Sequence, residues 1–568
     1  MLYRVSLRLL VCLIILLPSA IAFAQLDPWQ QGYDTGRLAM EEQQYEVAER
    51  WFQNALQEVE ALPPVDGRLG RVLDVLGTLY RAWSPARGET FFHDLGGQWE
   101  KENPDDPRLA PLLIALARLL HREPVDAEGY ARVVSLYRRA LEIQETAYGE
   151  QAPCLVGILE RLGWYAAQTG RDEAQAYYVR AIDIMVAADQ QHTGAAAMLH
   201  YALAGIHWEA GRHADAAQNW QRALEIYTEI DPDGAQTAYT LNRLAWTYER
   251  LGDYPRMTAC WERAAAVREK LDPTGWELLQ VLNDLANAQR LLGRLTEAEQ
   301  TCRQMLAIRK QAQSGSEDSA LVALADTLTR QGRIEEAKAL YAGVADPFRL
   351  RLHPAPARFR MLACLGLGQC ALAEGDRQAA MPWLIRAQEL RDHALESGDD
   401  EAAVAVRLAL HEYDIAAEIC ASLLDADARR YPPDHPRIAD HLALLAQAQA
   451  GAGAREKARD HIARALAIWD HAFDAGHPAL IPRLLAAAEN YQACGMQDAA
   501  AGCLARAEGI AGKAESVDGR LALARHYRTA GSTEKVNHYC ELAEIAGKRY
   551  PADSPVSQSI RRQIRALE

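Results

Sequence analysis

The sequence predicts an all-α protein, built as a right-handed superhelical solenoid of about thirteen helical hairpins with a C-terminal capping helix. Its 568 residues are more than one compact domain usually holds. Ala, Leu, Arg, Glu and Gln dominate while Phe occurs only 7 times, a composition that favours helices nearly everywhere. Glycines also recur at a fixed interval, which is typical of a repeat array. Length, composition and repetition together favour one long array over several globular domains.

The first residues, 1–24, have the pattern of an export signal. Arg4 and Arg8 are followed by an apolar stretch at 9–17 and a small-residue cleavage pattern at 22–24. The apolar stretch is well short of the roughly 20 residues that a spanning helix needs. We therefore expect a cleaved signal rather than a retained membrane anchor, and no membrane span in the mature chain. The excess of Arg over Lys and the abundant Ala indicate a GC-rich bacterial genome, so we expect a periplasmic or secreted protein.

Composition and motifs argue against nucleic-acid binding and against catalysis. The formal net charge of −16 removes the electrostatic basis for gripping phosphate backbones. The sequence has no HExxH, no paired CxxC, no GxSxG and no phosphate-cradling glycine loop. We expect no nucleic-acid partner, no catalytic residue, no cofactor and no metal, although a hidden pair of catalytic carboxylates stays open.

The cysteines indicate packing rather than cross-linking. One of them lies in the predicted signal, which leaves nine in the mature chain, an odd number that cannot pair completely. Cys302, Cys420 and Cys540 fall at a repeat position that we expect to be buried, where Cys is a small apolar filler. A disulfide between Cys494 and Cys503 remains an open alternative.

The repeat is set by glycine. Gly170, Gly211, Gly252 and Gly293 follow one another at intervals of 41 residues. The series continues less regularly with Gly332, Gly375, Gly495 and Gly531. Each glycine is expected to end the first helix of a hairpin in the left-handed backbone conformation that glycine adopts without strain.

A second pattern marks the second helix of each hairpin. It is a small residue, a large residue four positions later and another small residue three positions after that, as in Ala216, Trp220 and Ala223. These offsets place all three on one helical face. The small residues allow the paired helix to approach closely, while the large one fills the space between the two helices.

The pattern divides the mature chain into four segments. The hairpins are partly degenerate over 25–125, most of all around 76–95, and regular over 126–345. A second array, 346–550, follows after a Pro-rich break, and the polar segment 551–568 is expected to form the capping helix.

One repeat carries a nearly complete family motif. It consists of Leu244, Ala245, Tyr248, Gly252, Tyr254, Trp261 and Ala264. On these residues the chain resembles the tetratricopeptide repeat (TPR) family, and the resemblance extends over nearly the whole mature chain. Repeats of about 41–42 residues instead of 34, and the loop Asp434-His435-Pro436, are similar to the kinesin light chain subtype.

The resemblance implies where a partner would bind. In TPR proteins the first helix of each hairpin lines a concave groove that commonly receives a peptide. Counting back from the glycines of four repeats gives the candidate partner-binding residues Glu160, Arg161, Trp164, Tyr201, Trp208, Asn242, Arg243, Trp246, Asn283, Asp284, Asn287 and Arg290. Asn can pair with a peptide backbone, Arg can hold a carboxylate and Trp offers apolar area.

Two observations restrain this assignment. The same residues could form an ordinary solvated helix face, with the Trp side chains against the next hairpin. In later repeats the same count gives Val322, Ala323, Asp326, Leu365, Gly366 and Gln369, which are too plain to predict a polar site.

The leading hypothesis is an exported, non-catalytic scaffold or adaptor that binds a protein or peptide partner on its concave face. The alternative is a protein that captures carbohydrate or another small ligand on the groove aromatics. A third hypothesis, ranked below both, is an enzyme with an unrecognised site in the irregular region 62–124. Repeat architectures serve many roles, so the fold alone does not decide among them.

Overall fold

The computed structural model describes residues 27–62, 66–121, 127–169, 171–312, 317–346, 356–393, 400–513 and 516–567. The predicted signal, Gly170 and most of the Pro-rich break, 347–355, lie outside the described residues. The chain divides into two compact units, Met1–Arg212 and His213–Glu568. These units follow the packing of the helices, whereas the four segments inferred from repeat regularity stay a prediction.

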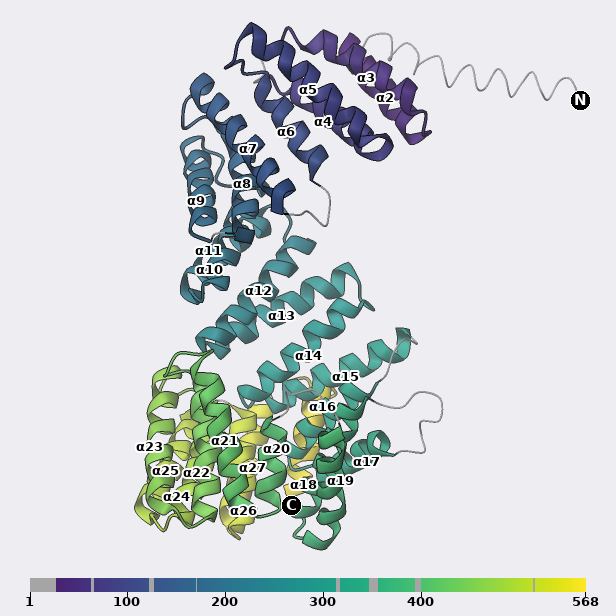
Figure 1. The fold of residues 1–568 in the computed structure, drawn as a ribbon. Helices are drawn as coiled ribbons and strands as arrows, with labels where there is room; N and C mark the ends of the chain where they lie inside the picture. Colours follow the sequence, from purple (N-terminus) through teal and green to yellow (C-terminus); the bar gives the residue numbers. More distant parts are fainter. Residues whose placement is uncertain are drawn as a thin grey trace, which may run out of the picture. The chain divides into compact units, whose positions relative to one another are not determined.

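The described part of the first unit is helical throughout (Figure 1). Its α-helices are α2 (Pro28–Glu41), α3 (Tyr45–Val59), α4 (Arg68–Trp83), α5 (Pro85–Glu102), α6 (Leu109–Leu120), α7 (Ala127–Tyr148), α8 (Val156–Thr169), α9 (Arg171–Ala187) and α10 (Gly194–Glu209). One 3-10 turn, η2 (Pro153–Leu155), precedes α8.

The second unit continues the same succession. Its helices are α11 (His213–Ile230), α12 (Ala235–Leu251), α13 (Tyr254–Leu271), α14 (Trp276–Leu291), α15 (Leu295–Ala312), α16 (Asp318–Arg330), α17 (Ile334–Ala345), α18 (Ala357–Ala373), α19 (Arg377–His393), α20 (Asp400–Ala409), α21 (Tyr413–Ala428), α22 (Pro436–Gly451), α23 (Arg455–Ala472), α24 (Leu480–Ala493), α25 (Gln497–Lys513), α26 (Val517–Thr529), α27 (Thr533–Gly547) and α28 (Pro555–Leu567). Taken in chain order, α2 to α27 make thirteen successive pairs and α28 is the final single helix. No strand occurs among the described residues, so the prediction of an all-α repeat solenoid with a capping helix is confirmed.

In most of the described helix pairs the turn is made by a residue with positive φ, whereas Ser84 between α4 and α5 has φ −154°. Gly252, at φ 74°, ends α12, and its N–H donates to the carbonyl of Glu249 at 3.0 Å. All the predicted glycines that the structure describes have φ between 70° and 81°. In the pair α20 and α21, which has no glycine at this turn, His411 takes the same conformation with φ 61°. The glycine positions are therefore confirmed, and His411 keeps the turn geometry where the glycine is missing.

The second-helix pattern is confirmed by burial. Ala216 and Ala223 are fully buried and Trp220 is 2% exposed. At Gly366 on the first helix α18, a large residue packs directly on the helix backbone. A Cβ added at Gly366 would lie only 2.3 Å from the ring of Tyr341, so glycine is required there for the two helices to approach.

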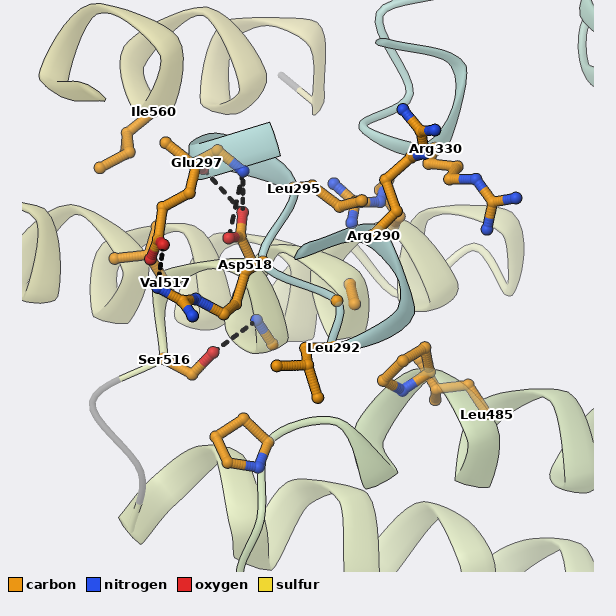
Figure 2. A pocket seen from close by; sticks show the side chains of 18 of the residues that line it. Arg290, Leu292, Leu295, Glu297, Arg330, Leu485, Ser516, Val517, Asp518 and Ile560 are labelled. Atoms are coloured by element: carbon orange, nitrogen blue, oxygen red, sulfur yellow. Dashed lines mark hydrogen bonds and ion pairs between the residues drawn. The ribbon is translucent and has the colours of Figure 1, made fainter. Parts of the chain in front are cut away.

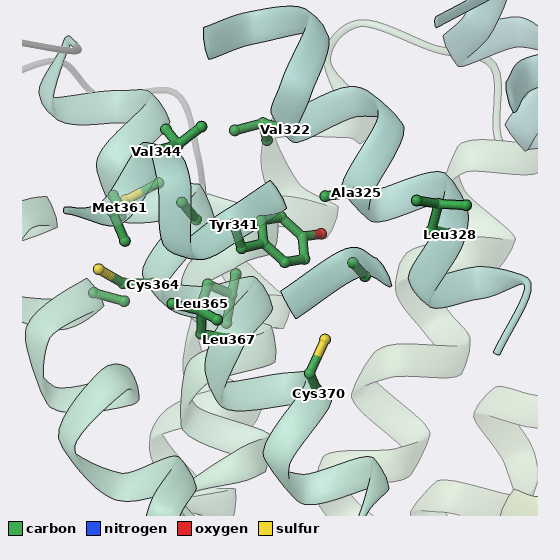
Figure 3. Close-up of a cluster of buried hydrophobic side chains, with 14 of the residues drawn as sticks. Val322, Ala325, Leu328, Tyr341, Val344, Met361, Cys364, Leu365, Leu367 and Cys370 are labelled. Carbon is green, nitrogen blue, oxygen red and sulfur yellow. The ribbon is translucent and has the colours of Figure 1, made fainter. Parts of the chain in front are cut away.

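The cluster around Tyr341 shows the role of the cysteines (Figure 3). Cys364 and Cys370 lie within it, and burial raises the pKa of both thiols. All nine cysteines of the described residues are free thiols, so the alternative of a Cys494–Cys503 disulfide is wrong. Cys503 is buried, whereas Cys494 lies half-exposed at the end of α24. The buried thiols act as apolar filler, as the sequence predicts for Cys302, Cys420 and Cys540.

Within the second unit the C-terminal helices return to the middle of the array, where the yellow helices of Figure 1 lie beside the teal ones. Three donors make the contact. His435 Nε2 donates to the carbonyl of Glu249 at 2.7 Å, Arg483 Nη1 to that of Leu291 at 3.0 Å, and Arg525 Nη1 to that of Gln331 at 3.2 Å. The donors come from the start of α22, from α24 and from α26, and the acceptors end α12, α14 and α16. We call these three contacts the closure.

The closure has a simple electrostatic reason. The last carbonyls of an α-helix have no partner within the helix, and the end of the helix dipole there is negative. A guanidinium or an imidazole N–H from another repeat satisfies these carbonyls. The glycine turns allow the approach, since a Cβ at Gly252 would lie 2.5 Å from the Cδ of Pro436.

A buried polar network lies beside the closure, between α15, α17 and α28. Glu299 accepts hydrogen bonds from Arg333 Nη1 at 2.8 Å, from Gln331 Nε2 at 3.2 Å and from Ser559 Oγ. Burial opposes the charge of Glu299, but the Ser559 hydroxyl and the Arg333 guanidinium outweigh it and lower the pKa of Glu299 to about 2. The network therefore ties the final helix to the middle of the array through an ionised carboxylate.

A second buried charge cluster predicts a pH dependence of stability. His441 on α22 is 2% exposed, with Nδ1 2.7 Å from Asp427 Oδ2 and Nε2 3.0 Å from Glu401 Oε1. Burial disfavours the imidazolium, but the two carboxylates outweigh it and raise the pKa of His441 to about 9. Protonated His441 therefore stabilises the fold. This contribution to the free energy of unfolding is complete below the unfolded pKa of about 6.5 and is lost as the pH rises through 9.

We therefore expect the melting temperature of the wild type to fall between pH 7 and pH 9.5, and that of His441→Gln to fall less. Thermal denaturation followed by circular dichroism at several pH values measures both profiles. The control His471→Gln, at a side chain that is 74% exposed, should follow the wild type. Parallel profiles for wild type and His441→Gln would show that His441 is not protonated in the fold.

Candidate functional site

The twelve candidate residues all lie on first helices of the repeat, divided between the two units. Glu160, Arg161 and Trp164 are on α8, with Tyr201 and Trp208 on α10, in the first unit. The other seven, Asn242, Arg243, Trp246, Asn283, Asp284, Asn287 and Arg290, are on α12 and α14 in the second unit. Each group is therefore considered within its own unit.

Several of the candidates are occupied by neighbours within their own hairpin. The ring of Trp246 lies edge-on to that of Trp261, with centroids 5.8 Å apart, and the Arg243 guanidinium is 5.5 Å from the Trp246 ring. Trp164 packs edge-on against Tyr165 at 4.9 Å and remains 39% exposed. These tryptophans thus combine a packing role with a partly accessible face.

A cavity of about 1070 Å³ is formed by the first helices α14, α16 and α18 together with parts of α15, α17 and α20, and we call it the groove. Residues at the offsets counted back from the glycines line the groove in three successive repeats. These lining residues are Asn283, Asn287, Arg290, Val322, Ala323, Asp326, Leu365, Gly366 and Gln369. The residues of the later repeats, which do not predict a polar site by themselves, thus lie beside the polar residues of α14.

Arg290 is held by its surroundings. Its side chain is 12% exposed and lies 3.4 Å from the Asp326 carboxylate. Nη1 donates to the Ala323 carbonyl and to Thr327 Oγ1, both at 3.2 Å. Because these partners are all on α16, Arg290 clamps α14 to α16.

Asp284 does not line the groove. Burial raises its pKa to about 6, and the Glu249 carboxylate adds to the shift against a weak hydrogen bond from Asn283 Nδ2 at 3.4 Å. The offset of nine residues before the glycine therefore gives groove residues at Ala323 and Gly366, but not at Asp284.

Trp276 and Arg309 are among the groove residues that the sequence pattern did not select. Trp276, at the start of α14, lines the groove and is 71% exposed. Arg309, near the end of α15, also lines it, and its buried Nε has no hydrogen-bond partner within the described residues. A signal for Trp276 was available, since it lies seven residues before Asn283 and so on the same helical face. Arg309 is on the second helix of its hairpin, whereas the count from the glycines covers only first helices.

Family models match the sequence in the middle of the chain. A tetratricopeptide repeat model matches residues 194–270, and a second tetratricopeptide repeat model matches residues 278–312. Over these two ranges the chain consists of tetratricopeptide repeats. The second match covers most of α14 and all of α15, so this part of the groove is built from a recognised TPR hairpin.

Solved structures similar to this TPR protein are also repeat proteins. BtubC (BKLC) from P. vanneervenii is 23% identical, with 41% of this chain and 94% of that one covered and a TM-score of 0.33. The nearly identical TPR-like repeats assigned to a kinesin light chain of Podosopora anserina are 20% identical, covering 36% and 99%, with a TM-score of 0.30. The APC/C hetero-tetramer Cut9-Hcn1 is 14% identical, covering 96% and 98%, with a TM-score of 0.33. No curated protein matches the TPR protein in sequence.

The TPR architecture is that of a repeat scaffold for protein interactions, and such scaffolds are typically non-catalytic. Among the described residues, no group of three or more His, Cys, Asp or Glu side chains is placed to hold a metal ion. No described helix combines the length and the apolar character needed to cross a membrane.

Proposed function

We propose that this TPR protein is an exported, non-catalytic adaptor that binds an extended peptide segment of a partner protein in the groove. The observation that supports it most directly is the groove itself, about 1070 Å³ in volume, with the exposed indole of Trp276 on its wall. Export to the periplasm or the exterior rests on the signal-like residues 1–24.

The groove has the chemistry that a peptide needs. The indole of Trp276 offers a large apolar surface, and tryptophan is among the residues that dominate binding energy at interfaces. Side-chain amides, which can pair with both the N–H and the C=O of a peptide backbone, are present at Gln280, Asn283, Asn287 and Gln369.

Arg309 selects the charge of the peptide. A buried N–H without a partner costs free energy, and a carboxylate is the partner that guanidinium groups bind most strongly. We therefore expect an acidic side chain or a C-terminal carboxylate of the peptide to reach Arg309, while apolar side chains contact Leu362 and Leu365.

The test is an affinity capture from envelope extract with the mature chain, residues 25–568. Wild type is compared with the double variant Trp276→Ala, Arg309→Ala. Overlapping peptides from a captured protein are then titrated by isothermal calorimetry. We expect the double variant to bind the active peptide about 10- to 100-fold more weakly, since truncating a hot-spot residue costs about 2 kcal/mol or more.

The matched control is Trp383→Ala with Arg377→Ala, two exposed residues of α19 that do not line the groove. It should bind the peptide as the wild type does. Equal affinity of the groove variant and the wild type would contradict the proposal. Binding of a glycan instead of any peptide, lost in the groove variant, would favour the alternative of carbohydrate capture on Trp276.

A further inference from the structure

A second cavity, distinct from the groove, lies where the closure brings the C-terminal helices of the second unit against the middle of the array (Figure 2). Its volume is about 780 Å³. One wall is the loop from Leu292 to Glu297, between α14 and α15, and the others come from α24, α26 and α28. We call it the closure cavity. Its volume falls within the range of roughly 300–1,000 Å³ that small-molecule sites occupy.

The walls of the closure cavity combine apolar and charged side chains. They include the side chains of Leu292, Leu295, Leu485, Val517, Val556 and Ile560. Figure 2 shows all of these residues except Val556 with labels around the space, and the Asp518 carboxylate turned toward the start of α15. An apolar ligand body would therefore find contacts on several sides.

The acidic groups of the cavity already have partners. Asp518 accepts from Thr296 Oγ1 at 2.7 Å and from the Thr296 N–H at 3.2 Å, which caps the first turn of α15. Glu297 pairs with Arg294, and Glu489 lies 3.6 Å from His526 Nδ1. Of these carboxylates, Asp518 also favours the charge of Arg525 from a distance, but its hydrogen bonds go to Thr296.

Arg525 is the cation left over. Its hydrogen bonds go to neutral oxygens, the Gln331 carbonyl at 3.2 Å and Gln563 Oε1 at 3.4 Å. No carboxylate lies within ion-pair distance of it in the part of the chain that the structure describes. Burial lowers the pKa of Arg525 to about 10, so the surroundings disfavour a positive charge that the group nevertheless carries near neutral pH. An anion in the cavity would relieve this cost.

His526 is a second group of the cavity that lacks a hydrogen bond, although its Nδ1 lies 3.6 Å from the Glu489 carboxylate. Its side chain is 9% exposed, and Nδ1 is buried without a hydrogen-bond partner. It shares one face of α26 with Ala522, Arg525 and Thr529, at the spacing of three and four residues that aligns side chains along a helix. A guanidinium and an imidazole on that face therefore line the same space.

We propose that the closure cavity binds a small organic anion with an apolar body, a carboxylate-bearing amphiphile, whose carboxylate pairs with Arg525 and hydrogen-bonds to His526. Because its walls come from both the middle and the C-terminal repeats, such a ligand stabilises the closure by mass action. The site takes a class of ligand different from the peptide of the groove, and it stands independently of the proposed function.

Sodium decanoate is the probe, titrated by isothermal calorimetry into residues 25–568. We expect one site for decanoate, with decyltrimethylammonium binding at least 10-fold more weakly because its charge is reversed. Arg525→Met, which removes the charge and keeps most of the side-chain length, should weaken decanoate binding about 10-fold or more. Arg528→Met, an exposed position on the same helix that does not line the cavity, is the matched control and should bind as the wild type does.

A second variant covers the case in which Arg525→Met loosens the closure. Ala522→Phe places a ring in the cavity and leaves both polar groups intact, so it should abolish decanoate binding while the circular dichroism spectrum stays that of the wild type. The groove variant Trp276→Ala, Arg309→Ala should bind decanoate normally. Absence of decanoate binding, equal binding of decyltrimethylammonium, or unchanged affinity in the Ala522→Phe variant would each overturn the proposal.

Discussion

Replacing Glu299 by alanine is expected to lower the free energy of unfolding of the second unit by about 3–5 kcal/mol, since removing one partner of a buried ion pair leaves the other charge uncompensated. The Arg333 side chain is 1% exposed and would lose its carboxylate at 2.8 Å. Ser559 would lose its acceptor on α15 at the same time. Urea denaturation gives the free energy, and hydrogen exchange of α15 and α28 shows whether the loss is centred there.

The control for this prediction is Glu335→Ala. Glu335 lies on α17, its side chain is 83% exposed and it pairs with Lys338 at the surface. Surface pairs of this kind contribute about 0–1 kcal/mol. Equal urea midpoints for the two variants would contradict the role of the buried network.

The same carboxylate predicts a loss of stability in acid. The pKa of Glu299 is lowered to about 2 in the fold, whereas an unfolded Glu titrates near 4.3. Its contribution is therefore complete above the unfolded value and is lost as the pH falls toward 2. Glu299→Ala should lack this part of the acid transition, which the same urea series at lower pH would reveal.

The second large effect is expected for Trp469→Ala on α23. The side chain is 2% exposed and is among the largest fully buried ones, and truncations of this kind cost about 3–5 kcal/mol. Its Nε1 also donates to Asp440 at 2.9 Å, and Asp440 in turn binds Arg483 at 3.1 Å. Because Arg483 makes one of the three closure contacts, the variant should loosen the closure as well as the core.

Denaturant midpoints measure the effect of Trp469→Ala. Trp383→Ala removes a tryptophan that is 39% exposed and should cost much less. Hydrogen exchange at the end of α14 should rise in Trp469→Ala and not in Trp383→Ala. A cost for Trp469→Ala no larger than that of Trp383→Ala would show that this part of the array is not tightly packed.

The local features of the fold could be predicted because each repeat carries them in its own residues. Positive φ is confined almost entirely to glycine, and the small, large, small pattern records close approach of two helices, so both are visible along one hairpin. The closure was not predictable, since His435, Arg483 and Arg525 reach carbonyls 186, 192 and 194 residues away.

The groove could be predicted from the sequence only in part. The offset count selects the correct face of α14, α16 and α18, yet the plain residues Val322 and Ala323 gain meaning only when three helices are brought together. Arg309 could not be found from the count because it reaches the groove from a second helix. That any of these residues binds a partner stays a prediction.

The closure also bears on how this gene can change. An open array of hairpins tolerates duplication or loss of a unit, since every unit meets only its neighbours. Here the first helices of three consecutive hairpins have acceptor carbonyls at their ends, at Glu249, Leu291 and Gln331. These ends contact the first helices of three consecutive later hairpins in the same order. Adding or deleting one hairpin between α13 and α22 would displace every pair by one step. The number of hairpins between the paired helices is therefore fixed, and we expect selection against recombination within that stretch.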